Sequence, residues 1–153
     1  MITRRNLVGL AAAVPALPVL LTATSARAAE PRIFQQGGLA LGGTDPVAYF
    51  EGNGPVRGDG AHALDWMDAR WTFASATNRD AFAADPERFA PAFGGYCAFA
   101  ASRGYLAPTI PEAWSLHEGR LFLNASLRAR ELWLAELPGV IAAGEANWPA
   151  ILG

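Results

Sequence analysis

The sequence contains no lysine, and all 12 of its basic residues are arginine. Reactions that need a lysine amine, such as Schiff-base formation, and phosphate binding by a P-loop lysine are therefore excluded. The chain also has a single cysteine, Cys97, and two histidines. A lone thiol has no partner within the chain for a disulfide, and a dithiol oxidoreductase is excluded for the same reason.

The first residues have the features of an export signal. Arg4 and Arg5 precede a mainly apolar run at 8–21, and residues 25–28 read Ser-Ala-Arg-Ala, the small-x-small pattern cut by signal peptidases. A membrane anchor is the alternative, but it needs about 20 consecutive apolar residues. The run is shorter and contains two prolines, so we predict a twin-arginine signal peptide and a periplasmic or otherwise exported protein.

We therefore divide the chain into a signal peptide, 1–28, and one domain, 29–153. The second part has 125 residues, which is enough for one hydrophobic core. It contains nine arginines and 14 acidic residues, a net charge of −5. This balance argues against nucleic acid or an anionic membrane surface as the partner, and we expect no membrane span after signal removal.

Alternating apolar and polar residues predict a first β-hairpin from 62–67 and 70–74, with the turn at Asp68-Ala69. One face of this hairpin carries large apolar side chains in two cross-strand pairs. The predicted pairs are Trp66 with Trp71 and Leu64 with Phe73.

A second hairpin is predicted from 114–117 and 120–123, because Glu118-Gly119 is a favourable two-residue turn. Pairing about this turn places His117 beside Arg120 on the face that points away from the core. The other face carries two apolar pairs, which are Leu116 with Leu121 and Trp114 with Leu123.

Helices are predicted around the hairpins. Ser75 caps a helix that runs to about Ala84, and a second short helix lies within 93–102 and is closed by Gly104. Asn124 caps a third helix, from 125 to about 137, and residues 140–146 continue it. The third helix is expected to turn Leu127, Leu132, Trp133 and Leu134 inward.

These elements predict a small single domain of the α+β class, in which two β-hairpins form an antiparallel sheet packed against short helices.

Two motifs stand out: Asp-Pro-Val-Ala-Tyr-Phe at 45–50 and Gly-Gly-Tyr-Cys-Ala-Phe at 94–99. With the Glu118-Gly119 hairpin and the closing Ala-Asn-Trp-Pro at 146–149, they make the chain resemble the YHS domain family, in its longer exported branch. The resemblance covers about residues 39–149. It implies a small domain that binds a metal ion, copper or zinc, and that works beside metal-transport proteins.

The chain departs from this family at four positions that hold sulfur ligands in short members. Ala48, Ala74 and Asn78 replace cysteines, and Phe50 replaces a methionine. Soft metal ions need two to four thiolate, thioether or imidazole ligands. The remaining candidates are Cys97, His62, His117 and Met67, and neither histidine has a local ligand spacing with Cys97.

Three interpretations of Cys97 remain open. It is a small buried hydrophobe between a tight Gly-Gly turn and a helix start, it is a metal ligand, or it is a reactive thiol activated by the helix dipole. The pair Gly94-Gly95 would let a ligand approach the backbone closely.

We predict a ligand pocket around Cys97, with Asp45, Tyr49 and Tyr96 as its polar walls. Asp45 is otherwise a turn residue that bonds local amides, and both tyrosines are otherwise core aromatics. The predicted function is an exported, non-catalytic binding module for a metal ion or a small ligand. The alternatives are a structural or protein-interaction domain with Cys97 buried, and a thiol-dependent enzyme that uses Cys97 with a histidine and Asp45.

Overall fold

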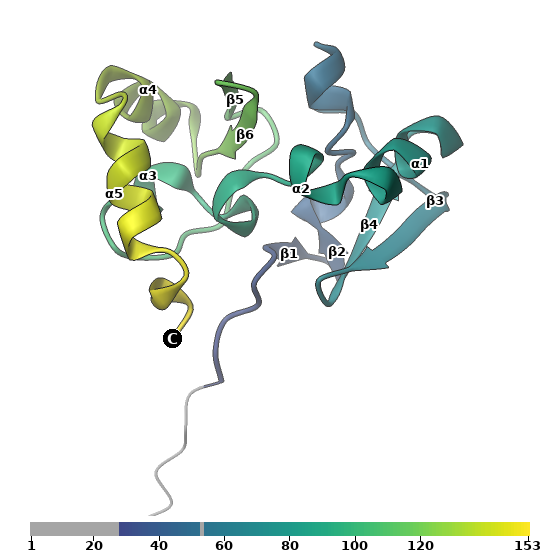
Figure 1. Ribbon diagram of the computed structural model, residues 1–153, viewed down its shortest axis with the longest axis horizontal. Helices are drawn as coiled ribbons and strands as arrows, with labels where there is room; N and C mark the ends of the chain where they lie inside the picture. Colours follow the sequence, from purple (N-terminus) through teal and green to yellow (C-terminus); the bar gives the residue numbers. More distant parts are fainter. Residues whose placement is uncertain (1–27, 53) are drawn as a thin grey trace, which may run out of the picture.

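The computed structural model describes residues 28–52 and 54–153. Apart from Ala28, the predicted signal peptide lies outside the described residues. The predicted α+β class is confirmed: short helices and two-stranded antiparallel sheets alternate along the chain (Figure 1). Within the described part of the chain, no helix has both the length and the hydropathy that a membrane crossing requires.

The six strands in the described residues form three separate sheets of two strands each. The two predicted hairpins therefore do not join into one sheet, and the N-terminal lead-in forms a third pair that we did not expect. The strands are β1 (Gln35–Gln36), β2 (Leu39–Ala40), β3 (Asp59–Trp66), β4 (Ala69–Phe73), β5 (Trp114–His117) and β6 (Arg120–Leu123).

Helices connect and cover these hairpins. They are α1 (Ala76–Ala84), α2 (Pro86–Phe89), α3 (Ala98–Ser102), α4 (Leu127–Ala135) and α5 (Gly139–Asn147). Four 3₁₀ turns complete the described chain: η1 (Leu41–Gly43), η2 (Ala48–Glu51), η3 (Ala92–Gly95) and η4 (Ala150–Leu152).

The first hairpin forms where we predicted it, but its register differs. Leu64 lies opposite Trp71, and Trp66 lies opposite Ala69. The turn is Met67-Asp68, and both residues have left-handed φ values of 51° and 57°, as a tight primed hairpin turn requires. The two tryptophans are diagonal neighbours, with ring centroids 5.9 Å apart.

The second hairpin has the predicted register throughout, from Trp114 opposite Leu123 to His117 opposite Arg120. The prediction of one core face and one solvent face is wrong, because β6 is buried on both sides. Leu116 is 40% exposed although its partner Leu121 is buried, and the half-buried ring of His117 packs edge-on against Trp133.

The helix starts follow capping chemistry. Ser75 caps α1 as predicted, since its hydroxyl accepts a hydrogen bond from the Asn78 amide at 3.1 Å. The predicted cap of α4 is wrong, because Ser126 rather than Asn124 caps that helix. The helix starts at Leu127, two residues later than predicted. Of the side chains predicted to face inward, Trp133 is buried, whereas Leu127 and Leu134 are 55% and 41% exposed.

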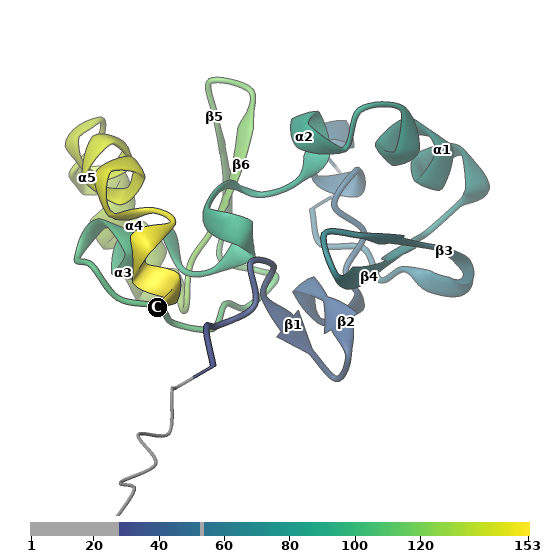
Figure 2. The same cartoon turned by 60° about the horizontal axis from the view of Figure 1, so that its bottom comes forward.

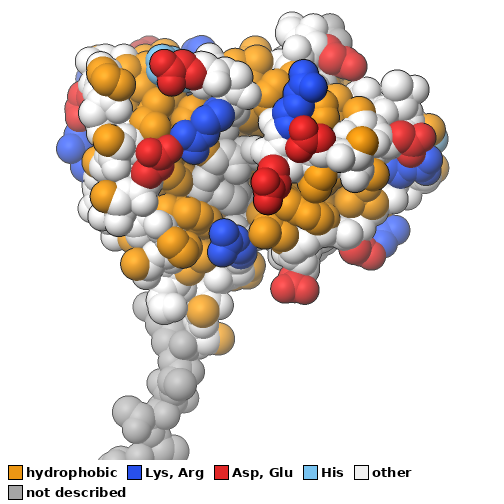
Figure 3. Space-filling model, viewed as in Figure 1, with side chains coloured by type: hydrophobic (Ala, Val, Ile, Leu, Met, Phe, Trp, Pro, Cys, Tyr) orange, Lys and Arg blue, Asp and Glu red, His pale blue; other side chains and the backbone are white. Residues whose placement is uncertain are grey.

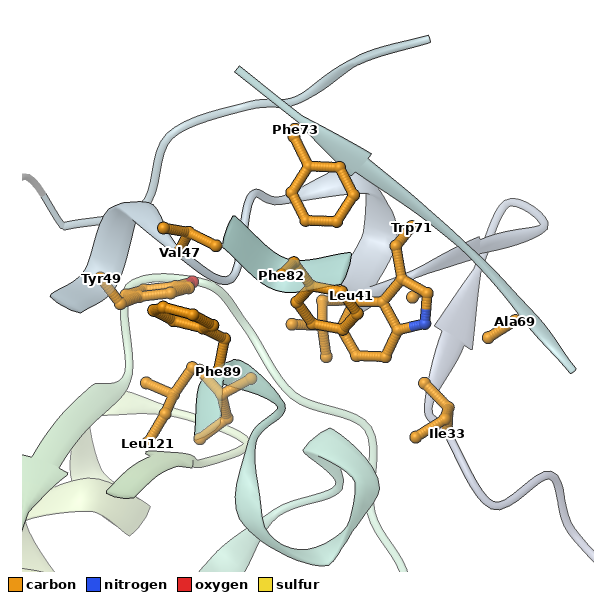
Figure 4. Close-up of a cluster of buried hydrophobic side chains, with 12 residues drawn as sticks. Ile33, Leu41, Val47, Tyr49, Ala69, Trp71, Phe73, Phe82, Phe89 and Leu121 are labelled. Atoms are coloured by element: carbon orange, nitrogen blue, oxygen red, sulfur yellow. The ribbon is translucent and has the colours of Figure 1, made fainter. Parts of the chain in front are cut away.

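Two hydrophobic clusters form the interior, and Figure 2 shows the elements that hold them as two lobes. The first cluster is built mainly by β2–β4, η1, η2, α1 and α2, with Trp71, Phe73 and Phe82 fully buried at its centre (Figure 4). The second is built by η3, α3, α4 and α5. Strand β6 connects them, because Leu121 belongs to the first cluster and Phe122 to the second.

Candidate functional site

Cys97 is the N-cap residue of α3 and is only 2% exposed. Its sulfur accepts a hydrogen bond from the Ala100 amide at 3.4 Å, and its thiol donates to Asn124 Oδ1 at 3.6 Å. The sulfur therefore caps a helix and is held inside the protein. A polar side chain does lie beside it, but that side chain belongs to none of the four residues predicted for the pocket.

Asn124 lies beside Cys97 and is not the helix cap that we predicted. It is fully buried directly after β6, and its Oδ1 also accepts a hydrogen bond from the Phe99 amide at 3.0 Å. Its Nδ2 has no hydrogen-bond partner among the described residues. The visible signal was a polar residue at the end of an apolar strand, but its contact with Cys97 spans 27 positions, which local patterns do not reveal.

The protein itself occupies the space beside Gly94-Gly95 that we assigned to a ligand. Both residues have left-handed φ values, 61° and 86°. A Cβ atom on Gly94 would collide with the carbonyl oxygen of Arg32, and one on Gly95 would collide with the side chain of Leu41. The glycines are thus required because two other segments of the chain pack against them.

Asp45 is fully buried in the first lobe and its carboxylate is saturated with hydrogen bonds. Oδ1 accepts from the Val47 and Ala48 amides at 2.8 and 3.4 Å, and Oδ2 accepts from the Ala74 amide and Asn78 Nδ2, both at 2.8 Å. The hydrogen bonds from the Val47 and Ala48 amides match the alternative in which Asp45 is a turn residue. The carboxylate also joins this turn to the start of α1.

The two tyrosine hydroxyls are used within the protein rather than shared at one point. Tyr49 donates to the Pro111 carbonyl at 3.1 Å, and Tyr96 donates to the Pro31 carbonyl at 2.8 Å. Burial raises the pKa of Tyr49 well above its usual range, and the Glu112 carboxylate adds to the effect. Burial also raises the pKa of Tyr96, with a smaller contribution from Glu30.

The surroundings of Cys97 do not favour a soft metal ion. The side-chain atom that bonds its thiol is a neutral amide oxygen, whereas copper and zinc prefer sulfur and imidazole ligands at such sites. Among residues 28–52 and 54–153, no group of three or more histidine, cysteine or acidic side chains is placed to hold a metal ion. Copper or zinc at Cys97 stays a prediction.

Tyr96 does line a cleft, which we call the tyrosine cleft. It has a volume of about 710 Å³ and lies between the N-terminal lead-in, the loop 104–108 and the C-terminal turn η4. Its aromatic walls are Phe34, Tyr96 and Tyr105, and Glu30 is the charged side chain among the described residues that line it. Cys97, Asp45 and Tyr49 are absent from its lining.

The walls of the tyrosine cleft are fixed by contacts between distant segments. The Phe34 and Tyr96 rings meet edge to face with centroids 5.6 Å apart. The lead-in is tied to η4 by the Glu30 amide, which donates to the Leu152 carbonyl at 2.8 Å. Tyr105 is 54% exposed, so its ring is open to a ligand.

Comparisons with protein families, with curated proteins and with solved structures gave no match to this chain. The resemblance to the YHS domain family therefore stays a prediction that depends on the sequence motifs quoted above. In the structure, Asp45 of the first motif and Gly94, Gly95 and Cys97 of the second all form contacts within the fold.

Proposed function

We propose that this chain is a non-catalytic binding domain that holds a small organic cation with an apolar body in the tyrosine cleft. The observation that carries the proposal is a cleft of about 710 Å³ lined by three aromatic rings and one carboxylate. Ligand pockets usually have volumes of about 300–1,000 Å³ and mainly apolar walls with a few polar groups.

The chemistry of the lining supports a cationic ligand. Aromatic faces attract organic cations, and the attraction is larger where the ring is partly removed from water. Glu30 adds a negative charge, and none of the described residues that line the cleft is an arginine. The aromatic rings and the Glu30 carboxylate therefore both favour a cationic ligand over an anionic one.

The absence of catalysis is part of the proposal, and the environment of Cys97 supports it. A nucleophilic thiol has to reach its substrate and needs a base within hydrogen-bond distance. Cys97 is only 2% exposed, and the hydrogen-bond partners of its sulfur are a side-chain amide oxygen and a backbone amide. These groups do not provide a base.

Calorimetric titration with benzyltrimethylammonium tests the proposed function, with neutral benzyl alcohol of similar ring size as the comparison ligand. We expect saturable binding of the cation, and about five-fold or more weaker binding in Tyr105→Ala and in Glu30→Gln. Met67→Ala and Glu131→Gln are matched controls, because both side chains are exposed outside the cleft. Equal binding of benzyl alcohol, or no binding of either ligand, contradicts the proposal.

The metal prediction is tested on the same protein. Elemental analysis of the purified full chain and of Cys97→Ser measures bound copper and zinc. A stoichiometric metal in the parent that is lost in Cys97→Ser would replace the cleft proposal with a metal-binding function.

We also propose export through the twin-arginine route, on the basis of residues 1–28. Replacing Arg4 and Arg5 together with lysine keeps the charge but changes the signal. Retention of the protein in the cytoplasm on fractionation of expressing cells is the expected result, and unchanged export contradicts this route.

A further inference from the structure

A second hollow lies on the other side of the lead-in, between the two lobes. It has a volume of about 230 Å³, and we call it the arginine groove because three arginines line it, namely Arg32, Arg88 and Arg120. Figure 3 shows basic, acidic and apolar side chains close to one another near the centre of this face of the molecule. The lead-in is fixed there, since the Phe34 amide donates to the Gly94 carbonyl at 2.9 Å.

The groove concentrates positive charge in an acidic protein. Three of the nine arginines in residues 28–153 line it, together with one acidic residue, Glu87. Arg120 is paired with Glu145 at 2.6 Å. Within the described ranges, Arg32 and Arg88 form no salt bridge, which distinguishes them from the paired arginines elsewhere on the surface, Arg70, Arg79, Arg103 and Arg128. The Arg88 guanidinium does lie over the Phe89 ring, 5.1 Å from its centroid, but neither Arg32 nor Arg88 has an acidic partner among the described residues, so both can pair with an external anion.

Aromatic side chains supply the rest of the wall. Trp66 and Trp148 are half-buried and both line the groove. Trp66 is held edge to face by Phe82 at 5.6 Å, and Trp148 packs against Phe93 at 6.1 Å between ring centroids. Fixed indole rings offer an apolar surface to a flat ligand without a large entropy loss.

We propose that the arginine groove binds a small aromatic carboxylate. Arg32 and Arg88 hold the carboxylate, because a planar guanidinium matches its two oxygens with parallel hydrogen bonds. The ring of the ligand contacts Trp66 and Trp148. The volume lies below the usual range for drug-sized ligands, so the ligand is small. This site shares none of its lining residues with the tyrosine cleft. The two proposals are therefore independent, and each is tested by its own experiment.

Nuclear magnetic resonance of the full ¹⁵N-labelled chain tests this proposal with benzoate as the probe. The indole Nε1–H signals of Trp66 and Trp148 report on the groove itself, while the indole of Trp133 in the second cluster is an internal reference. We expect the first two signals to shift in a saturable way while the Trp133 signal stays in place. In Arg32→Gln and in Arg88→Gln, benzoate should bind about ten-fold or more weakly, because each variant loses a charge-assisted pair.

Arg128→Gln is the matched control, since Arg128 is an exposed arginine on α4 outside the groove. Its affinity for benzoate should equal that of the parent. Arg32 and Arg88 are exposed, so the dispersed spectrum of each folded variant checks that binding rather than folding has changed. No shift with benzoate, equal binding of benzyl alcohol, or equal loss of affinity in Arg128→Gln overturns the proposal.

Discussion

At the scale of single residues, buried polar groups fix the backbone rather than open a site. Asp45 is a fully buried carboxylate, which is costly unless it is hydrogen-bonded. Four donors, from residues 47, 48, 74 and 78, satisfy it. Its distant partners lie 29 and 33 positions away, so the sequence could predict the Asp-Pro turn but not the link to α1.

Tyr49 gives a prediction for alkaline pH. Burial first, and then the Glu112 carboxylate, hold its pKa above the usual value of about 10 in the folded state. The stabilisation is complete below pH 10 and is lost above it, because the unfolded chain then releases a proton that the folded chain keeps. The free energy of unfolding should fall by about 1.4 kcal/mol per pH unit for this residue.

Urea unfolding between about pH 8 and about pH 11.5 measures this loss. In Tyr49→Phe the fall should be shallower by that amount, while Tyr105→Phe, at a 54% exposed position, should follow the parent. The absence of lysine removes the group that usually dominates this pH range. Parallel curves for the parent and Tyr49→Phe would show that the buried hydroxyl makes no such contribution.

The position of Cys97 could be predicted from the sequence only in part. A cysteine after Gly-Gly and before an alanine-rich stretch indicates a buried thiol at a helix start, and that alternative matches its position as the N-cap of α3. Its neighbour Asn124 comes from the end of a distant strand. Pairing of β6 beside Cys97 brings them together, and only the tertiary fold determines that pairing.

At the scale of elements, alternation predicted both hairpins, but it did not give the register of the first. The missing information was the conformation of Met67 and Asp68, which adopt positive φ without a glycine at the turn. Glu118-Gly119 carries its glycine at the turn, and there the predicted register was correct. A one-residue shift of the turn changes every cross-strand partner, which explains the difference between the two hairpins.

Helix α5 provides a prediction in which packing opposes helix propensity. Replacing a helical glycine with alanine normally stabilises a helix by up to about 1 kcal/mol. At Gly144, however, a Cβ atom would lie 2.6 Å from Cζ of Phe93, a ring that is 4% exposed and cannot move freely. We expect Gly144→Ala to lower the free energy of unfolding by about 1–3 kcal/mol.

Gly139 is the control within the same helix, because a Cβ atom there has no neighbour within 4 Å. Gly139→Ala should be neutral or stabilising by at most about 1 kcal/mol. Urea unfolding of the two variants measures the difference. If both changed stability in the same direction by the same amount, the close packing of α5 on Phe93 would not determine the effect.

At the scale of the whole molecule, β6 connects two interiors. Leu121 is fully buried in the first cluster, and its neighbour Phe122 is fully buried in the second. Adjacent strand residues point to opposite faces, so one strand places a side chain in each lobe. The lobes also share the contacts of the lead-in with η3. This arrangement predicts that neither lobe keeps its structure after the other has unfolded.

Truncation on either face of β6 tests this coupling. Leu121→Ala and Phe122→Ala should each lower the free energy of unfolding by about 2–5 kcal/mol through the cavity that each leaves. Hydrogen exchange of the backbone amides in α1 and in α5 follows the two lobes separately. Because both lobes lose β6 together, we expect either substitution to reduce protection in α1 and α5 by the same free energy. Loss confined to the lobe that contains the truncated side chain would mean that the lobes unfold independently, despite the strand they share.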